Sequence, residues 1–180
     1  MLHFAKPVCL AAGLFALAAC SGPIQTRIDT AILHAPERGA TYILAVPEGP
    51  PAPLAVEAAR LLEGRLSALG LTRTDDAEAA HYAASLSVSD RPADMSYAVD
   101  GAPLAKAKKR RALQSCKDRE IGIKLVLMRV KDAAIAYRGM AEEYHCKAKA
   151  VDVMPFLLDS ALSGFSGQNG QRTIERQGVE

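Results

Sequence analysis

Cysteine is the residue type in this chain whose number and spacing say most about its chemistry. Cys9 lies in an apolar run near the N-terminus, and Cys20, Cys116 and Cys146 follow it. If a signal peptide removes Cys9, three thiols remain, and an odd thiol in an exported protein requires an explanation. Acylation of Cys20 would supply one and would leave Cys116 and Cys146 as a pair in an oxidising compartment.

The first twenty residues have the pattern of a lipoprotein signal peptide. A polar start with Lys6 precedes the apolar run 8–19, which is too short to span a bilayer as a helix. The run leads into Leu17-Ala18-Ala19-Cys20, which resembles a bacterial lipobox. That resemblance implies cleavage before Cys20 and acylation of its sulfur and new amine, so that several acyl chains anchor the protein in a membrane. The alternative is ordinary secretion to the periplasm, because Ala16-Leu17-Ala18 is also an acceptable cleavage site.

The rest of the chain has the size and composition of one globular domain. The chain has 180 residues, with 23% charged and 49% hydrophobic residues, so wholesale disorder is not expected. We expect residues 1–19 to be the signal peptide, 20–25 the lipidated N-terminus and tether, 26–165 a single domain and 166–180 a polar tail. Ser21 rather than Asp follows Cys20. By resemblance to enteric lipoproteins, that favours the outer membrane, on its periplasmic face, over the inner membrane.

Cys116 and Cys146 flank the clearest hairpin in the sequence. Residues 121–141 alternate between apolar and other side chains on both sides of a turn. If the hairpin folds about residues 132–133, Cys146 faces Arg119, and Cys116 lies three residues further along, at the open end. A small bulge would bring the two Cα atoms within reach of a disulfide. The alternative, a redox or metal site, lacks a C-x-x-C motif.

A second candidate site is a run of basic residues. Such a run could bind the phosphate groups of an anionic lipid or glycolipid, or an acidic envelope protein. The alternative is a solvated loop, since charge runs alone are common. The run consists of Lys106, Lys108, Lys109, Arg110 and Arg111.

Composition and motifs give no support to several classes of function. A net charge of +2, 5% aromatic residues and no Trp do not favour a nucleic-acid partner. The sequence has no G-x-S-x-G, H-E-x-x-H or phosphate-binding glycine loop. His34, His81 and His145 belong to separate elements, and we expect them to be exposed or partly buried. We therefore expect no enzyme, and no catalytic residue, cofactor or metal site.

Hydrophobic periodicity predicts an α+β domain. The expected order, roughly β-β-α-β-β-β-α(-β), suits an antiparallel sheet with two helices packed on one face. Residues 90–118 read mainly as a long loop, and residues 173–176 could add an edge strand. The expected strands are 26–33, 41–46, 82–88 and the two arms of the hairpin, and the expected helices are 54–69 and 152–163, the second with a buried stripe of Val151, Met154, Leu158, Ala161, Leu162 and Phe165.

Short motifs over residues 24–178 resemble a family of small Gram-negative lipoproteins grouped as a domain of unknown function. They include an Asp132 turn followed by Tyr137-Arg138-Gly139, and a helix that contains Met154-Pro155. Tyr137 stands where that family usually has Trp, and His81 where it tends to have Asp. The chain is also distantly similar to auxiliary lipoproteins of envelope lipid-transport systems. The resemblance implies an outer-membrane lipoprotein without established catalysis, and it transfers no catalytic residue.

Three functions follow as hypotheses. The first is a non-catalytic envelope accessory or interaction module, anchored to membrane lipid through Cys20. The second is a module that binds anionic lipid or glycolipid through the basic run at 106–111. The third is an envelope hydrolase that uses Ser166 or His145, whose catalytic residues come together only in space.

Overall fold

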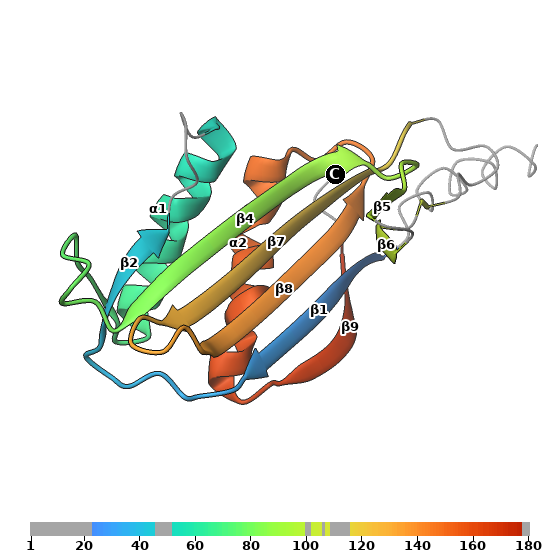
Figure 1. Cartoon of the computed structure of the whole chain (residues 1–180). Coiled ribbons are helices and arrows are strands. Elements are labelled where there is room, and N and C mark those ends of the chain that lie inside the picture. Colours follow the sequence, from blue (N-terminus) through green and yellow to red (C-terminus); the bar gives the residue numbers. More distant parts are fainter. Residues whose placement is uncertain (1–22, 46–51, 100–101, 106, 109–115, 178–180) are drawn as a thin grey trace, which may run out of the picture.

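Two helices cover the same face of a seven-stranded sheet in the computed structural model (Figure 1). The structure describes residues 23–45, 52–99, 102–105, 107–108 and 116–177. The two helices and the mostly antiparallel sheet confirm the predicted α+β class. The elements are β1 (Ile24–Ile32), β2 (Thr41–Ala45), α1 (Pro53–Ala68), β3 (Thr72–Arg73), β4 (Tyr82–Pro92), β5 (Tyr97–Val99), β6 (Ala102–Ala105), β7 (Arg119–Arg129), β8 (Ile135–His145), α2 (Ala150–Leu162), a 3-10 turn (Ser163–Ser166) and β9 (Gly170–Arg176).

The strands of the large sheet lie in the order β3-β2-β4-β7-β8-β1-β9. From β4 to β9 all neighbours are antiparallel, as expected. At the other edge the sheet differs from the expectation, because β2 runs parallel to both β3 and β4. The physical reason is α1, which follows β2 and carries the chain back across the sheet, as a crossover between parallel strands must.

The core lies between this sheet and the helices. α1 begins with Pro53 in its first turn and buries Ala58, Leu62 and Leu66, which the helical period places on one face. β7 contributes every second residue, and all four side chains are at most 1% exposed: Ile121, Ile123, Leu125 and Leu127.

α2 begins two residues before the expected start at Asp152. Its N-cap is Lys149, which makes no side-chain capping bond, and Asp152 lies in the first turn, where the helix dipole favours a negative charge. The buried face is wider than the predicted stripe, since α2 packs across β7, β8 and β1. Leu157 is fully buried, whereas Val151, expected in the stripe, is 46% exposed and was wrongly included.

The segment between β4 and β7 contains more regular structure than the expected loop. β4 continues to Pro92, and β5 pairs with β6 as a small antiparallel hairpin. At the C-terminal end, β9 pairs with β1 along its whole length, so the expected edge strand is confirmed and is longer than 173–176.

Candidate functional site

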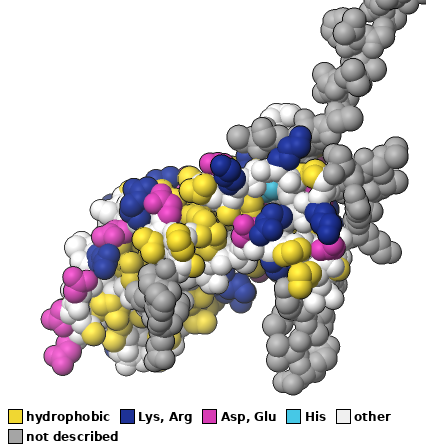
Figure 2. All heavy atoms as spheres, turned by 90° about the horizontal axis from the view of Figure 1, so that it is seen from above, with side chains coloured by type: hydrophobic (Ala, Val, Ile, Leu, Met, Phe, Trp, Pro, Cys, Tyr) yellow, Lys and Arg dark blue, Asp and Glu magenta, His cyan; other side chains and the backbone are white. Residues whose placement is uncertain are grey.

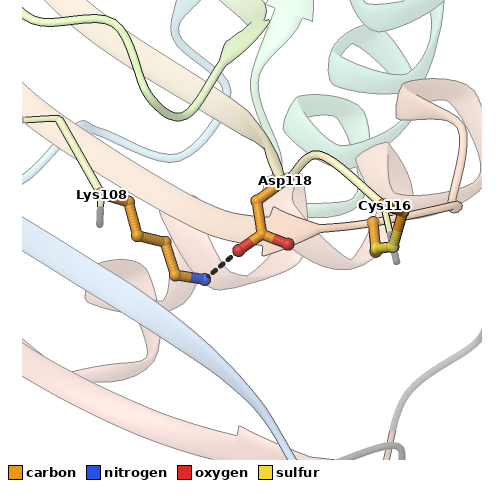
Figure 3. The surroundings of a disulfide bond; sticks show 4 residues. Lys108, Cys116 and Asp118 are labelled. Carbon is orange, nitrogen blue, oxygen red and sulfur yellow. Dashed lines mark ion pairs between the residues drawn. A yellow bond between two sulfur atoms is a disulfide. The ribbon is translucent and has the colours of Figure 1, made fainter. Parts of the chain in front are cut away.

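A disulfide joins Cys116 to Cys146 at the end of the sheet where β7 begins and β8 ends (Figure 3). Their Cα atoms lie 5.7 Å apart, within the usual range for such a bond. The predicted hairpin register is wrong by one residue, because Arg119 pairs with His145 rather than with Cys146. Beside the turn Met128 pairs with Ile135, which is two residues from the expected register, and the slip between Leu127 and Met128 reduces that difference to one.

We expect loss of this disulfide to lower the free energy of unfolding by ~3–4 kcal/mol, because the bond closes a long loop in the unfolded chain. The two cysteines are separated by 30 positions in the sequence. Urea unfolding of the oxidised protein and of a Cys116→Ser/Cys146→Ser variant measures the difference. Equal midpoints, or two reactive thiols in the oxidised native protein, would contradict the prediction.

Beside the disulfide, on the helix-covered face of the sheet, lies a fully buried carboxylate. Glu143 on β8 is 1% exposed and accepts a hydrogen bond from the Thr26 hydroxyl of β1. Arg176 at the end of β9 binds both carboxylate oxygens through Nε (2.9 Å) and Nη2 (2.7 Å). His145 Nε2 lies 2.7 Å from Oε2, and the Arg176 guanidinium also stacks on the Phe156 ring of α2, 4.3 Å from its centroid. One carboxylate thus connects three strands, and its arginine partner reaches α2.

Burial alone would raise the pKa of the Glu143 carboxyl, because a charge in the protein interior loses its water. The hydrogen bonds from His145, Arg176 and Thr26 outweigh that effect and lower the pKa to about 2. Glu143 is therefore ionised at neutral pH. A buried charge with all its acceptor positions used is typical of a structural cluster rather than of a site open to substrate.

The open face of the sheet carries a second polar cluster at the same end. Arg27 of β1 pairs with Glu142 (2.7 Å) and donates to the Tyr144 hydroxyl (2.7 Å). Arg91 of β4 pairs with Glu120, which is 6% exposed (2.5 Å). Burial, followed by a hydrogen bond with Glu120, raises the pKa of Tyr144.

Lys108 is the member of the predicted basic run that the structure describes, and it belongs to this cluster. Its ammonium lies 2.6 Å from Asp118 and 4.4 Å from the centroid of the Tyr144 ring (Figure 3). Its backbone N–H also donates to the Ala93 carbonyl (2.6 Å). Lys108 therefore forms contacts within the protein, and its side chain stays 26% exposed. The other members, Lys106, Lys109, Arg110 and Arg111, lie outside the described residues, as does Cys20.

The motif Tyr137-Arg138-Gly139 has a packing role. The buried Tyr137 hydroxyl donates to the Ala161 carbonyl in the last turn of α2. A Cβ on Gly139 would lie 1.9 Å from that same carbonyl oxygen, so only glycine permits this approach. Burial raises the pKa of Tyr137 to about 12, which keeps its hydroxyl a hydrogen-bond donor. Arg138 between them is exposed on the open face.

The histidines do not come together. His34 and His81 are exposed as expected, but His145 is only 4% exposed, so that expectation is wrong for His145. Its burial follows from the alternation of β8, which places every second residue from Tyr137 to His145 on the helix-covered face. Ser166 lies past the other end of α2, a helix about 20 Å long, so the two residues of the hydrolase hypothesis are far apart.

The described part of the chain contains neither a metal-binding cluster nor a membrane-spanning helix. Among those residues, no group of three or more His, Cys, Asp or Glu side chains is placed to hold a metal ion. No helix in the described ranges is long and apolar enough to cross a membrane.

Sequence reasoning missed the Glu143 cluster. The signal was present, since Glu143 has the same parity along β8 as Tyr137, Gly139 and Ala141, all of which are buried. A charged residue in an apolar register predicts a buried ion pair. What the sequence does not show is its partner, because Arg176 is 33 positions away and reaches Glu143 across β1.

The chain matches no family model and no curated protein, but it resembles several solved structures. The PelC dodecamer from Paraburkholderia phytofirmans is 14% identical, with a TM-score of 0.47, over 77% of this chain and 96% of that one. A PDZ domain protein from Parabacteroides distasonis is 9% identical, with a TM-score of 0.58, over 85% of this chain and 39% of that one. A DUF4136 family protein from Bacteroides thetaiotaomicron is 12% identical, with a TM-score of 0.44, over 78% of this chain and 94% of that one. At these identities the likeness concerns the fold.

Proposed function

We propose that this protein is a non-catalytic lipoprotein, anchored through acylated Cys20 in the outer membrane and facing the periplasm, where it serves as an accessory or interaction module of the envelope. The observation that carries the proposal is the use of the cysteines. Cys116 and Cys146 form a disulfide with each other. With Cys9 inside the expected signal peptide, Cys20 at the end of the lipobox-like sequence is the cysteine left for acylation.

The polar clusters beside the disulfide support a non-catalytic role. Glu143 has all its hydrogen-bonding positions filled by Thr26, His145 and Arg176, and Lys108 is paired with Asp118. A catalytic group needs an open position and a geometry that a substrate can reach. These side chains instead hold strands together.

The test compares the wild-type protein with a Cys20→Ala variant after fractionation of the envelope. We expect the wild type in the outer-membrane fraction, together with an envelope protein that co-isolates in fixed ratio after detergent extraction. The variant should leave that fraction, because the domain then has no acyl chain to hold it. Wild-type protein in the soluble fraction, or no co-isolating envelope protein, would contradict the proposal. Wild type in the inner membrane would correct the location alone.

A further inference from the structure

The position of Cys20 in the sequence decides which end of the sheet an acyl anchor would hold. Cys20 stands four residues before Ile24, where β1 begins. An extended chain spans at most about 3.6 Å per residue, so the two Cα atoms lie within about 14 Å of each other. β1 then runs roughly 26 Å to the opposite end of the sheet. We call this end of the sheet the tethered end; it holds the start of β1, the end of β8 and the disulfide.

Three lysines are exposed at the tethered end: Lys117, Lys147 and Lys149. Within the part of the chain that the structure describes, none of them forms an ion pair. Lys117 and Lys147 directly follow the two disulfide cysteines, whose Cα atoms are 5.7 Å apart, so the Cα atoms of these lysines lie within about 13 Å of each other. The long side chains can therefore reach one common surface.

Acidic side chains mark the end of the molecule opposite the tethered end. Figure 2 shows a group of them at that tip, whereas Lys and Arg side chains are visible at both ends. The acidic residues at that far end belong to the loop before β4 and are exposed: Asp75, Asp76 and Glu78.

Most carboxylates at the tethered end already have partners. Ion pairs there join Asp90 to Arg119, Asp118 to Lys108, Glu120 to Arg91, Glu142 to Arg27 and Glu143 to Arg176. Asp94, Asp152 and Glu175 are exposed near this end and reduce its excess of positive charge, and Glu175 accepts a hydrogen bond from Gln25 (3.1 Å). The three lysines nevertheless remain as cations directed to solvent beside the anchor.

We propose that the tethered end is a membrane-facing surface, on which Lys117, Lys147 and Lys149 bind the phosphates of anionic lipids in the leaflet that holds the acyl chains of Cys20. The inference rests on the proposed acylation. A basic patch beside an acyl anchor gives the second attachment that fixes orientation, and each lysine near an anionic surface strengthens binding about fivefold. The tethered end of the sheet then contacts the membrane, and the β7–β8 turn and the acidic loop 75–78 are directed away from it.

Lysine footprinting on vesicles tests this orientation. The full-length acylated protein is reconstituted into phosphatidylcholine vesicles with and without phosphatidylglycerol, and exposed lysines are acetylated and quantified by mass spectrometry. We expect Lys117, Lys147 and Lys149 to be acetylated about tenfold more slowly on the anionic vesicles, with the protection lost at high salt. Lys124 and Lys131, which are exposed elsewhere, are internal controls and should react at the same rate on both.

The intact mass of the same sample separates the two proposals. Acylated protein with equal acetylation of the three lysines on both kinds of vesicle overturns the membrane-facing surface and leaves the anchor standing. Protein without acyl mass overturns the anchor, and this inference with it.

Discussion

Replacing Gly139 by Ala is expected to lower the free energy of unfolding by about 4 kcal/mol, a large fraction of the stability of a domain this size. The new Cβ would lie 1.9 Å from the Ala161 carbonyl oxygen and 3.0 Å from the Tyr137 ring. Because the nearest atom belongs to the backbone of α2, no side-chain rotation relieves the overlap, and the last turn of α2 must move. That movement also breaks the buried hydrogen bond from Tyr137 to Ala161.

The matched control is Gly64→Ala in α1. A Cβ at Gly64 would meet nothing within 4 Å, and alanine is the better helix residue by about 1 kcal/mol. Chemical unfolding should therefore show a large loss for Gly139→Ala and no loss, or a small gain, for Gly64→Ala. A change at Gly139 of no more than about 1 kcal/mol would show that α2 does not approach β8 this closely.

Replacing Glu143 by Gln is expected to cost about 3 kcal/mol or more, because Arg176 then stays partly buried without a charged partner. The control is Glu142→Gln, the next residue, on the opposite face of β8. Its partner Arg27 is 48% exposed, so solvent screens that pair and the loss should stay below about 1 kcal/mol. Equal losses of unfolding free energy from the two variants would contradict the claim that the buried Glu143 pair stabilises the fold more than the exposed Glu142 pair.

The Glu143 carboxyl also makes a specific pH dependence testable. Its pKa is about 2 in the folded protein, against an ordinary value of 4.5. A pKa lowered by folding stabilises the protein above the unfolded value, and that stability is lost as the pH falls from about 4.5 to about 2. The wild type should therefore lose on the order of 3 kcal/mol relative to Glu143→Gln across that range. Parallel pH profiles for wild type and variant would exclude an ionised, hydrogen-bonded Glu143.

Much of the fold could be predicted because local sequence patterns determine which residues form each element and which side chains it buries. The leucine spacing of α1 and the alternation of β7 place the buried side chains correctly, and the cysteine positions lead to the Cys116–Cys146 disulfide. The hairpin register was missed by one residue. Ala133 in the turn adopts a positive φ of 54°, which few residues other than glycine do, and the pairing slips further along, between Leu127 and Met128.

The polar clusters were harder to foresee because their partners are distant in sequence. The sequence does not show that Lys108 of the basic run pairs with Asp118 and lies over Tyr144, because that contact exists only after β7 and β8 have paired. The parallel edge, in contrast, could have been expected from the order of the elements. A strand followed by a helix and a strand predicts a crossover, and β2, α1 and β4 form one.

The intact mass of the full-length protein extracted from its own envelope tests the central claim most directly. The acyl anchor predicts a chain that begins at Cys20, carries the mass of its acyl groups, and lacks two hydrogens because Cys116 and Cys146 are joined. Tandem mass spectrometry should place all the lipid on Cys20. A chain cleaved after Ala18, or one that begins at Cys20 without lipid, would contradict the account of this protein as a membrane-anchored module.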